Sequence, residues 1–286
     1  MSSTSLTWTL CFYSEPANMS GPEYIAETQT LPGTRNYEHN RVKVPIWDIR
    51  GEEHKFNLDE HSFLALPQAF SPGAEFEGDE GMARSYLPWV RDLVLKTVAG
   101  STGVFIFDHT VRRASAAKSP RRQVRKMHVD QSPGGALGRA RRHLPASERA
   151  AVESGCVRFR IVNVWRPLGP GEVADHPLVF ADCRTVAQED LVPVRQVYPD
   201  YVGETYAVRH GPGQRYHYWS RMGPRDVLLL QCFDSSRSGG GDRGAGGQCA
   251  NGSFELHEPL EEPCLRESIE PSFAPTRATR SRLRPF

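Results

Sequence analysis

Hydrophobic and polar residues alternate at 6–13 and again at 42–51, and short strand-like segments recur from residue 157 onward. Side chains of a β-strand point to opposite faces in turn, so this alternation predicts strands that bury one face. The later strands are expected at 157–166, 178–182, 204–209, 215–220 and 227–233. Glycine- and proline-containing turns at 169–171 and 211–213 separate them. Regularly spaced short strands of this kind are typical of an antiparallel sandwich or barrel.

A different periodicity, of three and four residues, predicts helices between the strand regions. Hydrophobic residues recur in this way from residue 79 to Gly100, and Pro88 is expected to kink or split the resulting helix. Two further helical segments are expected at 136–144 and 146–154, joined at Pro145. The elements together predict a mainly β fold with flanking helices.

The 286-residue chain is long enough for one large domain, which we expect to span residues 1–270. Residues 1 to about 40 read as one strand and an extended segment that wraps the main body. Residues 235–247 are rich in glycine, serine and arginine and are expected to form a flexible loop. The arginine-, proline- and threonine-rich end, 271–286, is expected to be a disordered tail.

Composition excludes several classes of function. The formal net charge is +1, and the basic run at 112–126 lacks interleaved aromatic residues, so no nucleic-acid partner is expected. No apolar run reaches the roughly 18–20 residues needed to span a bilayer, and the start lacks the features of a signal peptide. The six cysteines form no C-x-x-C pair, which argues against a zinc ribbon. We expect a soluble, cytoplasmic protein with reduced thiols.

The most informative short motif is His128-Val-Asp130, in a segment with strand character. Residues two apart in a strand point to the same face, so the imidazole and the carboxylate can converge on one point. These are two of the three ligands in the facial triad of non-haem iron(II) oxygenases. A triplet of this kind also arises by chance in many proteins, so it needs support from elsewhere in the chain.

A second candidate group lies near the end of the predicted domain, where Arg266 and Ser268 are two residues apart on an expected strand. A guanidinium with a hydroxyl on the same face can hold a carboxylate through two parallel hydrogen bonds. The alternative is an ordinary surface arginine. His257, nine residues before Arg266, is a candidate for a third metal ligand.

Several segments, in order and spacing, resemble the fungal hydroxylase/desaturase family. This family includes the gibberellin desaturase, the aspergillic acid hydroxylase/desaturase and the small cephamycin methoxylation protein. The matching segments are 107–113, 128–133, 162–167, 182–184, 201–206, 229–235 and 266–270, with 47–51 upstream. The resemblance covers roughly residues 40 to 270 and is far more specific than any single triplet.

The resemblance implies a double-stranded β-helix, the cupin-like or jelly-roll core, and an enzyme that is a non-haem iron(II)- and 2-oxoglutarate-dependent dioxygenase. Its substrate would be a small secondary-metabolite intermediate that is hydroxylated or desaturated. His128 and Asp130 then become metal ligands, and Arg266, supported by Ser268, becomes the anchor for 2-oxoglutarate. No catalytic residue separate from the metal site is expected.

The family's third ligand is a histidine fifteen residues before that arginine, where this chain has Asn251. An amide oxygen is a poorer ligand for iron(II) than an imidazole. Three alternatives follow: Asn251 coordinates weakly, His257 substitutes for it, or iron binding is impaired. In the last case the protein would be a non-catalytic paralogue or partner subunit. A hydrolase is not supported, because the chain has neither a G-x-S-x-G nor an H-E-x-x-H motif.

Overall fold

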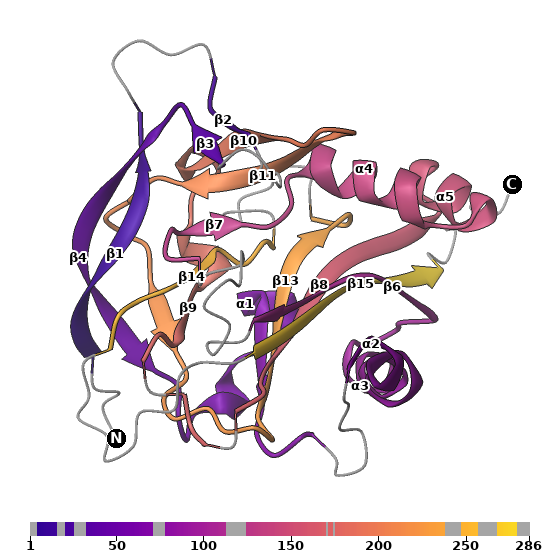
Figure 1. Ribbon diagram of the computed structural model, residues 1–286, viewed down its shortest axis with the longest axis horizontal. Coiled ribbons are helices and arrows are strands. Elements are labelled where there is room, and N and C mark those ends of the chain that lie inside the picture. Colours follow the sequence, from indigo (N-terminus) through magenta and orange to yellow (C-terminus); the bar gives the residue numbers. More distant parts are fainter. Residues whose placement is uncertain are drawn as a thin grey trace, which may run out of the picture.

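The alternating segments form two sheets of mainly antiparallel strands that face each other (Figure 1). The computed structural model describes residues 5–15, 21–25, 33–70, 78–112, 124–169, 171–173, 175–237, 247–256 and 268–278. This arrangement is the expected mainly β architecture. Within the described part of the chain, no helix combines the length and the apolar character needed to cross a membrane.

The larger sheet has ten strands and contains the His128 segment near its middle. Its order is β1 (Ser5–Ser14), β4 (Glu38–Asp48), β12 (Tyr216–Tyr218), β9 (Leu178–Ala181), β14 (Asn251–Ser253), β7 (His128–Val129), β11 (Val202–Val208), β10 (Leu191–Val197), β2 (Glu23–Ile25) and β3 (Thr34–Arg35). The smaller sheet has the order β5 (Phe63–Leu66), β13 (Val227–Asp234), β8 (Val157–Pro167), β15 (Ser268–Ala278) and β6 (Gly103–Arg112).

The main core lies between the two sheets. Phe63 of the smaller sheet meets Phe180 of the larger one with ring centroids 4.6 Å apart. Leu228 and Leu230 of β13 point into the same hydrophobic cluster. Every residue of β13 is buried, and Val227 and Leu229, on the opposite face of the strand, pack against a helix. A strand covered on both faces needs a continuous hydrophobic run, which the sequence supplies at 227–230.

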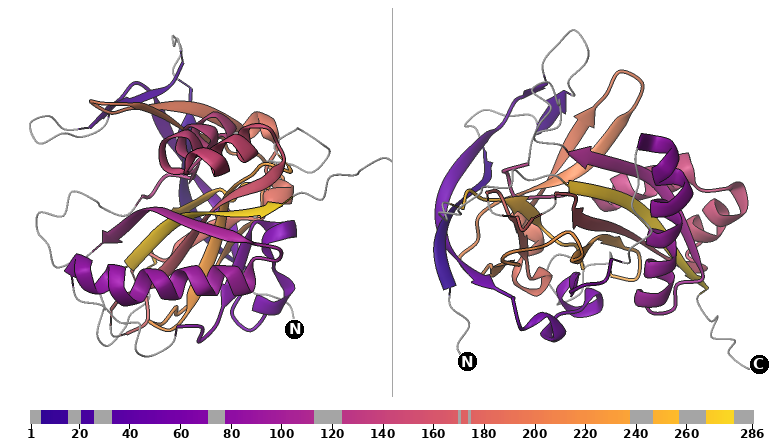
Figure 2. Two further views of the ribbon diagram at one scale, coloured as in Figure 1. Left: turned by 90° about the vertical axis from the view of Figure 1, so that its right-hand side faces the viewer. Right: turned by 60° about the horizontal axis from the view of Figure 1, so that its bottom comes forward.

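Helices cover the outer face and one end of the smaller sheet. α2 (Gly78–Gly81), a π-helical turn (Met82–Tyr86) and α3 (Leu87–Thr97) form one helical segment whose hydrophobic face packs on β8 and β13. Figure 2 shows α3 lying along this sheet. The expected irregularity at Pro88 takes the form of the preceding π-helical turn, since proline has no N–H to donate to the turn before it. α4 (Pro133–His143) and α5 (Ala146–Glu153) pack at the end of the sheets, over Phe159 and Phe233. Short helical turns complete the chain at α1 (Leu58–His61) and at three 3₁₀ segments (Glu53–Lys55, Cys183–Thr185 and Gln188–Asp190).

The chain ends differ from expectation in two respects. The prediction of a disordered tail at 271–286 is wrong for residues 271–278. This segment is the second part of β15, which continues to Ala278 and pairs with both β6 and β8. The prolines at 271 and 275 are unusual in a central strand, which is why the sequence did not predict one here. A β-bulge between Ser272 and Phe273 shifts the pairing register with β6. β1 is a full partner of β4 and buries Leu10 and Phe12, so it does more than wrap the body. Residues 238–246 of the expected flexible loop, and 279–286, lie outside the described residues.

Because the core between the sheets is closely packed, shortening a side chain there should lower the stability of the fold markedly. Leu230→Ala should lower the free energy of unfolding by about 2–5 kcal/mol, because Leu230 is fully buried between the sheets. Val202→Ala, at an exposed strand position, is the matched control and should change it by less than about 0.5 kcal/mol. Urea unfolding followed by circular dichroism measures both. Equal effects of the two substitutions would contradict the core described here.

Candidate functional site

His128 and Asp130 meet at the end of β7, with their side chains turned toward one point. The imidazole Nδ1 of His128 lies 3.0 Å from the backbone carbonyl of Lys126. A carbonyl oxygen can only accept, so Nδ1 carries the proton and donates it. Nε2 lies 3.3 Å from Oδ1 of Asp130, where it donates in an ion pair when the ring is protonated and offers its lone pair to a metal ion when the ring is neutral. Metal-binding histidines are commonly fixed in this way by a backbone carbonyl.

Asp130 is held from the opposite sheet. Its Oδ2 accepts a hydrogen bond of 3.0 Å from Nδ2 of Asn163 in β8, and the Cys232 thiol of β13 lies 3.5 Å away. Burial alone would raise the pKa of Asp130, but the charge of His128 and hydrogen bonds from His128, Cys232 and Asn251 hold the pKa below its ordinary value. Asp130 is therefore an anion at neutral pH.

Asn251 lies directly across from His128 in the neighbouring strand. The two residues are paired between β14 and β7, so their side chains share a face of the sheet. Asn251 is buried, and its amide nitrogen donates to the Cys249 carbonyl at 3.3 Å. A Cβ at Gly252 would lie 3.0 Å from the Lys126 carbonyl, so the glycine permits this close approach of the strands. The sequence-predicted residues His128, Asp130 and Asn251 are thus brought together.

A small cavity of about 70 Å³ joins these three side chains to one residue that sequence reasoning missed. That residue is Glu270 of β15, whose Oε1 accepts a 3.0 Å hydrogen bond from Asn163. Asn163 therefore links the carboxylates of Asp130 and Glu270. Asn163 and Glu270 lie in two of the segments that carry the family resemblance, 162–167 and 266–270. Membership of these segments was the one sequence signal that could have pointed to them. Among the described residues, no group of three His, Cys, Asp or Glu side chains is placed to hold a metal ion.

The other sequence-predicted site residues are Ser268, Arg266 and His257. Ser268 is buried at the start of β15 and is two residues from Glu270, on the same face of the strand. Arg266 and His257 lie outside the described residues.

His217, by contrast, packs among aromatic rings, and burial lowers its pKa to about 4. His217 is half-buried and lines a separate cavity with Asp182 and Arg215, away from the His128 pair.

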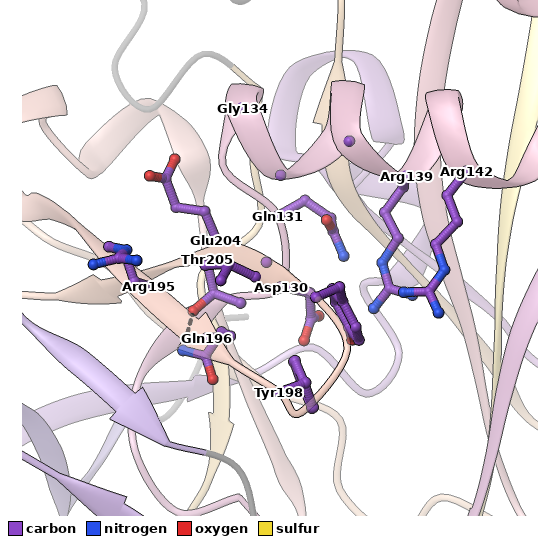
Figure 3. A pocket seen from close by; sticks show the side chains of 15 residues that line it. Asp130, Gln131, Gly134, Arg139, Arg142, Arg195, Gln196, Tyr198, Glu204 and Thr205 are labelled. Atoms are coloured by element: carbon purple, nitrogen blue, oxygen red, sulfur yellow. Dashed lines mark hydrogen bonds between the residues drawn. The ribbon is translucent and has the colours of Figure 1, made fainter.

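A larger cavity of about 400 Å³ opens on the other side of Asp130 (Figure 3). Its walls are α4 and the hairpin of β10 and β11, and Asp130 lines both cavities. The size is within the range of small-molecule sites. Figure 3 shows Arg139 and Arg142 reaching into it from α4, with Tyr198 on the hairpin side.

The start of α4 is packed tightly against β11. Ser132 caps the helix, its hydroxyl accepting from the Gly135 N–H at 3.0 Å and donating to the Glu204 carboxylate. Pro133 follows at the first helical position, where proline is favoured. A Cβ on Gly135 would lie 2.2 Å from the Glu204 carbonyl oxygen, so only glycine fits. The Ser-Pro-Gly-Gly sequence after Asp130 thus fixes one wall of the larger cavity.

Comparison with known proteins gives a consistent result. A family model described as "YDMC: Oxidoreductase/YMDC permease-like domain" matches residues 10–272. "Hydroxylase/desaturase CTB9" of Cercospora beticola is 31% identical over 80% of this chain and 74% of its own. "Fe(II)/2-oxoglutarate-dependent dioxygenase nvfI" of Aspergillus novofumigatus is 30% identical over 70% of this chain and 73% of its own.

Solved structures agree on the fold. The "iron and alpha-ketoglutarate-dependent endoperoxidase NvfI with different conformation" superposes with a TM-score of 0.81 and 24% identity, and the match covers 97% of this chain and 100% of that one. A second structure of NvfI gives a TM-score of 0.80 and 23% identity, with 96% and 99% covered. These likenesses confirm the expected jelly-roll fold.

Two glycines of α4, Gly135 at its start and Gly138 in its middle, predict different effects of an added methyl group. Gly135→Ala should lower the free energy of unfolding by about 1–3 kcal/mol, because its Cβ would collide with backbone. Gly138→Ala, in the same helix with open space around its Cβ, should leave stability unchanged or raise it by up to about 1 kcal/mol. Urea unfolding of both variants makes the comparison. A loss at Gly138 as large as at Gly135 would show that the contact with β11 is not the cause.

Proposed function

Because the chain belongs to the hydroxylase/desaturase family of oxidoreductases, we propose that it is an iron(II)- and 2-oxoglutarate-dependent dioxygenase that hydroxylates or desaturates a small secondary metabolite. The observation that carries the proposal is the His128–Asp130 pair. It presents an imidazole lone pair and a carboxylate oxygen 3.3 Å apart, beside a cavity large enough for a small molecule.

The donor set fits a divalent iron ion. His128 would supply Nε2 and Asp130 would supply Oδ1, with Asn251 beside them in the position of the third ligand. Iron(II) with 2-oxoglutarate would supply the oxidation of a C–H bond by dioxygen. The protein's part is positioning: the Lys126 carbonyl fixes the tautomer of His128, and Asn163 orients the carboxylate of Asp130.

Asn251 sets the expected strength of iron binding. Its pairing with His128 supports Asn251, rather than His257, as the residue in the third-ligand position. An amide oxygen is a weaker donor than an imidazole, so we expect iron(II) to bind less tightly than it would to two histidines and a carboxylate. The alternative of a non-catalytic partner is not favoured, because the relatives are named as hydroxylases, desaturases and dioxygenases.

We assign the anchoring of 2-oxoglutarate to Arg266, with Ser268 in support. Ser268 is buried at the first position of β15, two residues before Glu270. Glu270 lines the small cavity beside His128 and Asp130. A guanidinium just before Ser268 would pair with the far carboxylate of the cosubstrate.

A cytoplasmic location is part of the proposal. The cysteines of the described residues, Cys11, Cys156, Cys183, Cys232 and Cys249, are all free thiols. Free thiols are usual in a reducing compartment. Cell fractionation with an antibody against the chain would test this assignment.

Iron binding tests the proposed function most simply. Anaerobic protein mixed with iron(II) and 2-oxoglutarate should develop the weak visible charge-transfer band of the ternary complex. Asp130→Ala should abolish the band, because it removes the anionic ligand, while Glu80→Ala, at an exposed helix position, should leave it intact. A wild-type protein that gives neither the band nor succinate on any substrate would overturn the enzyme assignment.

The third ligand can be tested separately. Asn251→His should raise iron(II) affinity by roughly tenfold or more, a change of the size seen when metal sites gain or lose supporting groups. His257→Ala should change it little. Iron titration by equilibrium dialysis under anaerobic conditions measures both. The reverse pattern, a loss at His257 and no gain at Asn251, would mean that Asn251 does not occupy the ligand position.

A further inference from the structure

The larger cavity beside Asp130 places two arginines of α4 next to a pair of stacked tyrosines. We propose that it binds a substrate with a carboxylate attached to a planar, conjugated skeleton, and that Arg139 and Arg142 hold the carboxylate. The inference takes the reaction from the proposed function. The way in which the substrate is recognised is argued from the residues of the cavity.

Arg139 and Arg142 are neighbours on one face of α4. They are three residues apart, which places their side chains on the same side of the helix. Figure 3 shows both side chains descending from α4 toward the same side of the cavity. Two guanidinium groups side by side repel each other, so an anion between them is stabilising. Their fixed planar forks suit a carboxylate.

The acidic neighbours of these arginines are distant. Arg139 Nη1 lies 4.0 Å from Asp108, and Arg142 Nη2 lies 3.7 Å from Asp200. Both separations exceed the roughly 2.7–3.2 Å of a good hydrogen bond. Direct N–H donors therefore remain available to a ligand.

The other charges around the cavity are engaged at short range. Arg195 pairs with Glu23, and the Glu204 carboxylate accepts from the Ser132 hydroxyl. Asp130 belongs to the His128 pair. Among the described residues that line the cavity, Arg139 and Arg142 are thus the two arginines whose ion pairs are long, while Asp130 and Glu204 keep their negative charge on the other walls.

The hairpin opposite α4 supplies the planar surface. Tyr198 and Tyr201 face each other across the turn, with ring centroids 4.3 Å apart and planes only 8° from parallel. The Tyr198 N–H donates to the Tyr201 carbonyl at 2.9 Å, which holds the two strands together at this point. Burial and the neighbouring Tyr201 raise the pKa of Tyr198 to about 12, so Tyr198 is neutral. Because Arg142 covers Tyr201, a conjugated skeleton in the cavity would pack against the Tyr198 ring.

Arg142 joins the two features. Its guanidinium carbon lies 4.3 Å from the centroid of the Tyr201 ring. A guanidinium stacked on a ring keeps its in-plane N–H groups directed outward, where they can bind a carboxylate. A substrate held by its carboxylate at α4 would have its other end toward Asp130, on the wall of the same cavity. The arginines would thus select the substrate and set which C–H bond faces the metal pair.

The cosubstrate 2-oxoglutarate is also a carboxylate, so the test must separate the two sources of charge. The probes are 2-naphthoate and its neutral methyl ester, titrated by calorimetry into wild-type protein that is free of iron and 2-oxoglutarate. We expect 2-naphthoate to bind, and Arg139→Gln/Arg142→Gln to weaken it roughly tenfold to hundredfold, as expected when charge-assisted hydrogen bonds are lost. Methyl 2-naphthoate should bind the wild type more weakly than 2-naphthoate by a similar factor.

Two further variants control for charge and folding. Arg84→Gln removes an exposed arginine from another helix and should leave 2-naphthoate binding unchanged. Arg142→Lys keeps the charge but loses the planar fork, and should give an intermediate affinity. Circular dichroism confirms that each variant is folded.

Three results would overturn the proposal: equal binding of 2-naphthoate and its ester, unchanged binding in the folded double variant, or displacement of 2-naphthoate by 2-oxoglutarate at comparable concentration. The last would mean that the arginines hold the cosubstrate. Because the titration uses no iron, it is independent of the charge-transfer band. Absence of the band with 2-naphthoate binding intact would remove the proposed reaction and leave the carboxylate site standing.

Discussion

The placement of the two-residue strand β7 is the constraint on which the site depends. β7 lies between β14 and β11, and each neighbour approaches it closely. On one side, Gly252 lets β14 reach the Lys126 carbonyl, which places Asn251 opposite His128. On the other, Gly135 lets the start of α4 rest on the backbone of β11. A Cβ at Gly135 would collide with the backbone of β11, and one at Gly252 would press on the Lys126 carbonyl.

Asn163 connects this arrangement to the second sheet. Its amide donates to both Asp130 and Glu270, at 3.0 Å each, so one side chain from β8 fixes a carboxylate from each sheet. Asp130 in turn divides the space around it. The smaller cavity lies toward Asn251 and Glu270, and the larger one lies toward α4. This division suits a reaction in which a cosubstrate and a substrate reach one metal from different sides.

The sequence predicted the parts of this structure that depend on local pattern. The spacing of His128 and Asp130 was enough to place them on a common face, and the hydrophobic pattern located five of the later strands but not β10 or β14. Tertiary pairing decided the rest. β15 contains prolines that argue against a central strand, yet β6 and β8 enclose it from both sides. Glu270 and Asn163 have no distinctive spacing, and they meet only because β15 pairs with β8. The same holds for Arg139 and the tyrosine hairpin, which only the packing of α4 brings to one cavity.

The central claim is that His128 and Asp130 hold iron(II). The most direct measurement is anomalous X-ray diffraction, above and below the iron edge, from crystals grown anaerobically with iron(II) and 2-oxoglutarate. The account predicts one anomalous peak, within bonding distance of Nε2 of His128 and Oδ1 of Asp130 and next to Asn251. A peak elsewhere, or none in crystals that contain ordered His128 and Asp130 side chains, would contradict it.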